Sequence, residues 1–330
     1  MASAAGPGGR VMTVTGPRAA ASLGVTDAHD HLSIRSPALP GQEIDDLDRI
    51  LVEAADGRAS GLAALVELTP IGLGRRPDHL RAVAERTGLT VIGATGYHRD
   101  AHYPAGHWVH DAPIETLADR AIADLLEGMH PDDWNDPDRG LDPARAGVIK
   151  AGASYQRISR GEARRLEAIA AAARASGAAI IAHTEVGTCG ADIVDRLERD
   201  GVPTSRIALA HLDRNPDPEV HLELAARGVT LEYDTVGRIK YRPDSDLLDL
   251  IETVAAAGHL DRIALGLDLG THDYYRSYDG GPGLRYLMET FVPRLRRRLG
   301  DAAVQTILVD APARLLALAP VAAAVPPEPR

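Results

Sequence analysis

The sequence predicts a single-domain (β/α)8 barrel, on three observations. Eight short apolar segments alternate with longer amphipathic ones, and most of the intervals between them carry a helical pattern. Strands that alternate with helices pair in parallel, and eight such units favour closure into a barrel. The chain of 330 residues is long enough for a barrel with its loops. Periodicity alone leaves an open doubly wound sheet as the alternative. No Gly-x-Gly-x-x-Gly fingerprint follows the first strand, so a dinucleotide-binding fold has no positive support.

Each expected strand is a short apolar run that ends in polar or turn residues. The eight are Val25–His29, Ala63–Leu68, Thr90–Thr95, Gly147–Ala151, Ala179–His183, Arg206–His211, Thr230–Tyr233 and Arg262–Leu267. The clearest expected helices have apolar residues at spacings of three and four among Ala, Leu, Arg and Glu. They are Gly161–Ser176, Gly190–Asp200, Pro218–Ala226 and Leu247–Ala257.

The two ends of the chain are expected to lie outside the barrel, which would occupy residues 11–319. Residues 1–10 are small and Gly-rich, and residues 320–330 are rich in Ala and Pro. We therefore expect a flexible N-terminus and a C-terminal tail.

The composition of the chain limits the binding partners and the cellular compartment that we expect for the protein. The formal net charge of −11 disfavours nucleic acid and anionic membranes, because both require a basic surface. No apolar run reaches the ~20 residues of a membrane span, and Cys189 is the one cysteine, which indicates a reducing compartment. We expect a cytoplasmic enzyme with a small-molecule substrate, as a monomer or a homodimer.

The first strand ends in a pair of histidines. His29 and His31 are two residues apart, and side chains alternate faces along a strand, so both imidazoles point the same way. Two imidazoles on one face can share a metal ion. Taken alone, however, a His-x-His pair also occurs as surface or core histidines.

Four further side chains stand at the ends of other strands, where barrel enzymes keep their chemistry. His183, His211 and Asp268 each follow an apolar run, and each can bind a metal. Lys150 ends Gly147-Val148-Ile149 in the same way. A buried ammonium is costly unless it is paired or neutral. Lys150 is therefore expected either to react with CO2, giving a carbamate that bridges two cations, or to form a salt bridge with an acidic neighbour.

The order His-x-His, Lys, His, His, Asp resembles the phosphotriesterase family of the amidohydrolase superfamily over almost the whole chain. Several stretches are closest to the family's sugar-lactonase branch. They are Ala94-Thr95-Gly96-Tyr97-His98, Lys150-Ala151-Gly152-Ala153-Ser154-Tyr155, His183-Thr184-Glu185-Val186-Gly187-Thr188, His211-Leu212-Asp213-Arg214-Asn215-Pro216-Asp217 and Lys240-Tyr241-Arg242-Pro243-Asp244-Ser245.

The resemblance implies two metal ions and assigns their ligands. His29, His31 and Asp268 would hold the more buried ion, and His183 and His211 the more exposed one, with N6-carboxylated Lys150 bridging both. Zinc is the default ion for such ligands, with manganese or cobalt as alternatives. Two such ions would activate a bridging water at neutral pH, and Asp268 would accept its proton and pass it to the leaving group.

The substrate is expected to be a lactone, and in particular a sugar lactone with or without a phosphate. The histidine that the resemblance predicts after the seventh strand for phosphotriester hydrolysis is replaced by Thr235. Lys240 and Tyr274 match the phosphate-holding positions of the sugar lactonases, whereas the arginine position reads Thr271-His272. The guanidinium of Arg276 or Arg238 would then have to compensate. Tyr97 is expected to lean over the metals as a hydrogen-bond donor, from a loop containing His98, His102, His107 and His110 that faces the substrate.

Three other functions stay open at this point. Amide hydrolysis of a small N-acyl compound would use the same metals, and promiscuous phosphotriester hydrolysis would be a minor activity. An inactive barrel that serves as a binding protein is the non-enzyme alternative, against which the six intact ligand positions argue.

Overall fold

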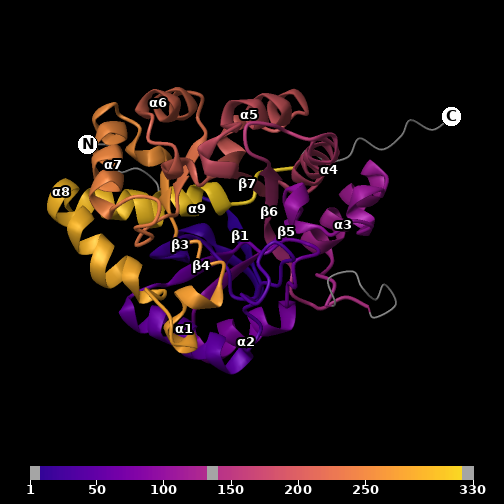
Figure 1. Ribbon diagram of the computed structural model, residues 1–330, viewed down its shortest axis with the longest axis horizontal. Helices are drawn as coiled ribbons and strands as arrows, with labels where there is room; N and C mark the ends of the chain where they lie inside the picture. The colour runs from indigo at the N-terminus through magenta and orange to yellow at the C-terminus, as the bar shows by residue number, and fades with distance from the viewer. Residues whose placement is uncertain (1–7, 132–139, 322–330) are drawn as a thin grey trace.

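Eight parallel strands surround the centre of the molecule in the computed structural model, which describes residues 8–131 and 140–321 (Figure 1). They are β3 (Thr26–Asp30), β4 (Ala64–Glu67), β5 (Thr90–Gly96), β6 (Ala146–Ala153), β7 (Ala179–Thr184), β8 (Ile207–Ala210), β9 (Thr230–Tyr233) and β10 (Ile263–Leu265). Each strand pairs with its neighbours in chain order. The predicted barrel is confirmed, and every expected strand is present within two residues of its expected bounds.

The sheet closes between its last and first strands just beyond β10. The amides of Leu267 and Asp268 both donate to the carbonyl of His29, at 3.1 and 2.9 Å. Gly266 makes this approach possible, because a Cβ there would lie 2.7 Å from that of His29. The closure therefore places Asp268 directly beside the end of β3.

Helices cover the outside of the sheet (Figure 1). They are α1 (Leu47–Ser60), α2 (Pro77–Thr87), α3 (Ile114–Leu126), α4 (Arg160–Ser176), α5 (Gly190–Arg199), α6 (Pro218–Ala226), α7 (Asp244–Ala256), α8 (Val292–Gln305) and α9 (Ala311–Leu316). The sequence marks α4 most clearly. Ser159 and Glu162 form a capping box at its start, and Gly177 ends it with a φ of 74°. None of the described helices is both long and apolar enough to cross a membrane.

The interior of the barrel is filled by small and branched side chains that point inward from alternate strand positions. Examples are Ala64, Val66, Ile92, Val148 and Ile181, all fully buried. A second and larger apolar cluster lies between the strands and the helices. The interior of the barrel is therefore packed, as in other barrels whose ligands bind at the ends of the strands.

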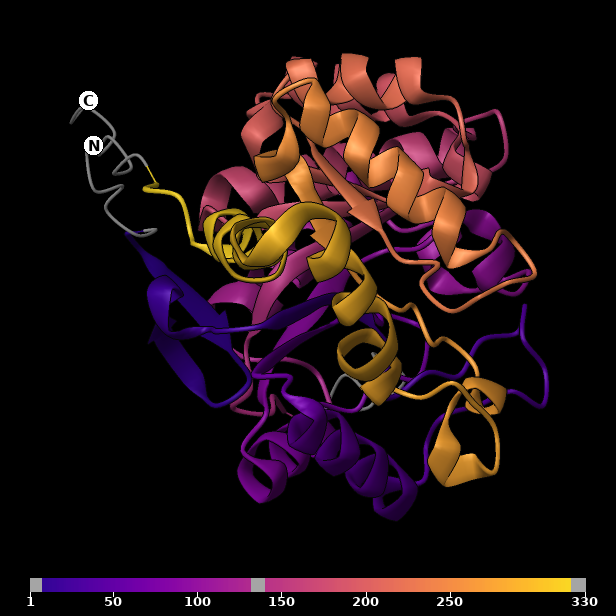
Figure 2. The same cartoon turned by 90° about the vertical axis from the view of Figure 1, so that its left-hand side faces the viewer.

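A short antiparallel hairpin, not anticipated from the sequence, precedes the barrel. It consists of β1 (Arg10–Thr13) and β2 (Gly16–Ala19). The hairpin packs against the start of β6, where a Cβ on Gly147 would lie 2.1 Å from the carbonyl oxygen of Met12. It thus covers the end of the barrel away from the predicted site, and Figure 2 shows it beside the last described residues after α9.

The chain ends are only partly described. Arg10, which we expected in the flexible N-terminus, begins β1, and its carbonyl accepts a hydrogen bond from the amide of Leu318 at 2.8 Å. The amide of Ala319 donates to the carbonyl of Gly177 at 2.9 Å. Residues 1–7 and 322–330, which make up most of the expected flexible N-terminus and C-terminal tail, lie outside the described residues.

Candidate metal centre

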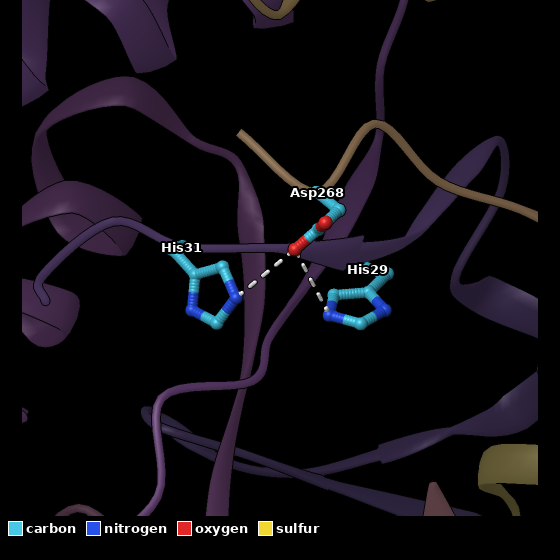
Figure 3. Close-up of side chains that lie close together, drawn as sticks. All are labelled: His29, His31 and Asp268. Carbon is cyan, nitrogen blue, oxygen red and sulfur yellow. Dashed lines mark ion pairs between the residues drawn. The ribbon is translucent and has the colours of Figure 1, made fainter. Parts of the chain in front are cut away.

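His29, His31 and Asp268 meet at the end of the barrel (Figure 3). The Nε2 atoms of His29 and His31 lie 3.5 and 3.4 Å from the same Asp268 oxygen, Oδ1. The pairing register shifts between Asp27 and Asp30 on β3, so this strand is irregular where it presents the two imidazoles. Three ligand atoms within 4.8 Å of one another can surround a single cation.

The opposite nitrogen of each imidazole is held by a partner. His29 Nδ1 lies 2.5 Å from Glu232 Oε1 and 3.1 Å from Asp234 Oδ2, and His31 Nδ1 lies 2.8 Å from Thr69 Oγ1. A proton held at Nδ1 leaves the lone pair at Nε2, which is the arrangement seen in histidines that bind metals. The donor set and its orientation therefore fit a divalent ion.

Lys150 completes this part of the site from β6. Its amine lies 3.2 Å from His29 Nε2, and the side chain is 1% exposed. It forms no ion pair with a carboxylate among the residues that the structure describes, in contrast to the salt-bridge alternative. Burial lowers the pKa of Lys150 below its ordinary value. A buried amine that loses its proton readily is suited to react with CO2.

His183 and His211 lie next to this group, their ring centroids 4.5 Å apart. His183 Nε2 contacts Glu185 Oε2 at 2.7 Å, which leaves Nδ1 as the ligand atom. His211 has a left-handed backbone, with a φ of 64°, and its Nδ1 contacts Asp234 Oδ1 at 2.7 Å, which leaves Nε2. Both imidazoles thus keep one nitrogen for a second ion.

Asp234 contacts one histidine from each of the two proposed ligand groups, His29 and His211. Besides its contacts with the two imidazoles, its Oδ2 accepts a hydrogen bond from the amide of His211 at 2.9 Å. Burial alone would raise the pKa of this carboxyl, but His211 and His29 hold it well below its ordinary value. The group His29, His211 and Asp234 also satisfies the distances of a metal site. Its contacts are instead those of a carboxylate that orients two metal-binding imidazoles.

The centre opens into a cavity of about 200 Å³. Five of the six predicted ligands line it, whereas His29 lies beneath with no exposed surface. The lining ligands are His31, Lys150, His183, His211 and Asp268. Lys240 and Tyr274, the predicted substrate contacts, line the same cavity.

The other two predicted substrate contacts lie elsewhere. The hydroxyl of Tyr97 donates to the carbonyl of Leu117 on α3 at 2.8 Å, and its side chain is 1% exposed. Successive side chains alternate faces at the end of β5, so Tyr97 packs outward and His98 enters the cavity. Tyr97 therefore does not lean over the centre. Arg276 is about half exposed, and its Nε lies 3.8 Å from Asp56.

Two arginines that line the cavity contact the candidate metal centre, although the sequence did not assign them to it. Arg214 donates to Asp268 Oδ2 at 2.6 Å, and Arg238 donates to the same oxygen. Burial would raise the pKa of Asp268, but Arg238 and His211 hold it well below its ordinary value. The two ion pairs therefore favour the ionised form of Asp268, which is the form that a metal ligand or a proton acceptor requires. The signal available in the sequence was that Arg214 follows His211 by three residues.

Comparison with known proteins agrees with this geometry. The model of the phosphotriesterase family matches residues 9–316. A phospho-furanose lactonase from Mycoplasmopsis agalactiae is 33% identical over 322 residues, covering 93% of this chain and 91% of the relative. An amidohydrolase structure from Mycoplasma synoviae has a TM-score of 0.91 and 30% identity, covering 95% of this chain and 93% of its own. A lactonase structure from Listeria monocytogenes has a TM-score of 0.87 and 25% identity, covering 94% of this chain and 100% of its own.

The chain belongs to the phosphotriesterase family. It is a metal-dependent hydrolase that acts on a small molecule, and the family it belongs to uses two metal ions.

Replacing Asp234 with Asn is expected to weaken metal binding about 10- to 100-fold, the usual effect of removing a partner of ligating histidines. The side chain would keep its size, but an amide cannot accept from His29, His211 and the His211 amide at once. Titration of the metal-free protein with zinc measures the loss. Asp249→Asn on the exposed side of α7 is the matched control. Unchanged zinc affinity in the Asp234 variant would contradict this role.

Proposed function

We propose that the enzyme hydrolyses a sugar lactone that carries a phosphate or another anionic group, with Asp268 as the proton shuttle. The observation that carries this proposal is the composition of one wall of the cavity. We call this wall the cationic wall. It consists of Arg214, Arg238, Lys240, Tyr241 and Tyr274. Cations and phenols both bind oxygen, and a guanidinium clamps a phosphate most strongly.

Contacts among these side chains make the wall one unit. The Arg238 guanidinium carbon lies 5.4 and 5.5 Å from the ring centroids of Tyr241 and Tyr274. Lys240 Nζ lies 5.2 and 5.3 Å from the same two centroids. Arg238 lines the cavity and Arg276 does not, which supports Arg238 as the arginine that compensates for Thr271-His272. The name of the phospho-furanose lactonase relative supports a phosphorylated substrate.

We assign separate roles in the reaction to the side chains at the site. Bound divalent ions would supply an activated water and polarise the lactone carbonyl. We assign the six predicted residues His29, His31, Lys150, His183, His211 and Asp268 as their ligands, with Lys150 carboxylated. Asp268 takes the proton from the attacking water and delivers it to the ring oxygen that leaves when the C–O bond breaks. Arg214 and Arg238 keep its carboxylate ionised and fix its direction.

The surroundings of Thr235 disfavour phosphotriesters as the main substrates. The Thr235 amide donates to Asp213 Oδ2 at 2.9 Å, and its hydroxyl donates to the same oxygen. A threonine fixed in this way cannot relay a proton outward as a histidine would. Assays of phosphorylated and neutral furanose lactones, an N-acyl amine and a phosphotriester test the proposal. The phosphorylated lactone should have the highest kcat/KM, and preference for the amide or the triester would refute it.

Replacing Lys240 with Met should raise KM for a phosphorylated lactone about tenfold or more, since a hydrogen-bonded ion pair with phosphate contributes ~1.5–3 kcal/mol. The effect on KM for the neutral lactone should be several times smaller. Steady-state kinetics on both substrates measure the difference. Arg276→Met is the matched control, because its side chain lies outside the cavity. Equal changes for the two lactones in the Lys240 variant would refute the assignment of this wall.

A further inference from the structure

Two imidazoles line the cavity without belonging to the metal centre or to the cationic wall. His98 and His102 come from the segment after β5, and their ring centroids lie 3.8 Å apart. The His98 ring also lies 4.6 Å from that of His183. Both side chains are less than 10% exposed. Buried polar rings at a substrate cavity require an explanation, since neither is needed to hold a metal.

The hydrogen bonds of His98 fix its tautomer. The amide of Arg99 donates to His98 Nδ1 at 2.8 Å, so this nitrogen is an acceptor and carries no proton. The ring proton of the neutral imidazole therefore lies on Nε2. In the part of the chain that the structure describes, no group hydrogen-bonds to this Nε2–H.

Ser36 fixes the tautomer of His102 in the same way. Its Oγ lies 2.8 Å from His102 Nδ1 and accepts a hydrogen bond from the amide of Ala38 at 3.2 Å. His102 Nδ1 is then the acceptor available to the serine proton among the described residues. We therefore assign Ser36 as the donor to Nδ1, which places the proton of the neutral His102 ring on Nε2 as well.

The same hydrogen bonds make both rings neutral, because an imidazole whose Nδ1 accepts a hydrogen bond carries its one proton on Nε2. Neutral donors attract uncharged oxygen atoms without competing for the anion that the cationic wall would bind. The cavity thus has two recognition surfaces of different chemistry.

We propose that His98 and His102 donate from Nε2 to neighbouring uncharged oxygens of the substrate, so that this pair selects hydroxylated lactone rings over alkyl lactones. The inference rests on the proposed function and concerns the uncharged ring substituents of the substrate, which the cationic wall would not contact. Two donors on adjacent rings match two oxygens on adjacent carbons of a sugar. Ser36 acts as a positioning residue that holds the His102 proton on the productive nitrogen.

Variants of His102 give the first test. His102→Phe removes the donor, whereas the amide of His102→Gln can replace Nε2–H. For a hydroxylated furanose lactone, kcat/KM should fall about threefold to tenfold more than for unsubstituted γ-butyrolactone in His102→Phe, as expected for one neutral hydrogen bond. His102→Gln should recover most of this difference. A polyhydroxylated γ-lactam, which resists hydrolysis, should lose the same factor in Kd.

Variants of Ser36 separate proton placement from packing. Ser36→Ala should give a smaller loss in the same direction, and Ser36→Thr should restore wild-type discrimination because it keeps the hydroxyl. His110→Phe is the control, since His110 belongs to the same segment but lies outside the cavity. Metal content is measured throughout because His98 contacts His183. Equal losses for both lactones, or a full loss in His102→Gln, would overturn the inference. A wild-type enzyme that hydrolyses no lactone would instead overturn the proposed function.

Discussion

Replacing Lys150 with alanine is expected to remove most of the bound metal and to lower kcat/KM by at least about a thousandfold, a loss of ~4 kcal/mol of transition-state stabilisation. The reason is the position of its amine. Lys150 Nζ lies beside His29 Nε2 and forms no ion pair with a carboxylate among the described residues, which suits it to carry the carbamate. Without Lys150, the carbamate that we propose as the bridge between the two metal ions could not form. Elemental analysis and steady-state kinetics on the same sample measure both losses.

Short carboxylic acids should restore part of the metal and activity of Lys150→Ala, because acetate or propionate can occupy the space of a carbamate. Lys240→Ala is the matched control, since it also removes a lysine from the cavity but should keep its metal and show no response to the acids. Removing CO2 and bicarbonate during metal loading should lower metal uptake in the wild type alone. Full metal content in Lys150→Ala, or wild-type loading that ignores CO2, would contradict the carbamate.

The strands and the ends of the strands were predictable from the sequence because they depend on local patterns. An apolar run followed by His183, His211 or Asp268 predicts both the end of a strand and a candidate metal-binding side chain at that end. The period of two placed His29 and His31 on one face. Parallel pairing then brought all of these ends together at one end of the barrel. The hairpin of β1 and β2 was missed because β2, Gly16-Pro17-Arg18-Ala19, is largely exposed and contains no apolar run.

The partners of the ligands could not be predicted, because they are distant in the chain. Glu232 contacts His29 across 203 residues. In the sequence, Glu232 and Asp234 simply flank Tyr233 at the end of β9, and nothing states which histidines they face. Only the register of the closed barrel decides this.

The predictions for Tyr97 and Arg276 were wrong for a different reason, which is the geometry of single residues at strand ends and in loops. A shift of one residue at the end of β5 decides whether Tyr97 or His98 enters the cavity. Local spacing cannot fix such a shift, because the backbone turns there: Gly96 has a φ of 94°, and a Cβ on it would lie 2.2 Å from the carbonyl oxygen of Lys150. The choice between Arg238 and Arg276 likewise depends on loop paths that sequence patterns do not encode.

Asp268→Asn should lower kcat by about two to four orders of magnitude, the range over which general acid–base catalysis contributes, with a smaller change in KM. Asparagine has the same shape, so the backbone hydrogen bond that closes the barrel would persist. The amide, however, cannot carry a proton from water to a leaving oxygen. The amide also has two possible orientations. In one, its NH2 group would face the guanidinium groups of Arg214 and Arg238. In the other, its oxygen would face the arginines and its NH2 group would face the imidazoles of His29 and His31.

Single-turnover kinetics with metal analysis of the same preparation test this expectation, and Asp273→Asn, an exposed carboxylate near the cavity, is the control. The measurement also decides how the ion pairs with Arg214 and Arg238 act. If they serve to orient the proton acceptor, then Arg238→Lys should lower kcat far less than Asp268→Asn does, since a positive charge is kept. A value of kcat for Asp268→Asn within about threefold of the wild type, at full metal content, would show that the proton takes another route. The carboxylate would then be a metal ligand alone, and the arginines around it would act on the substrate.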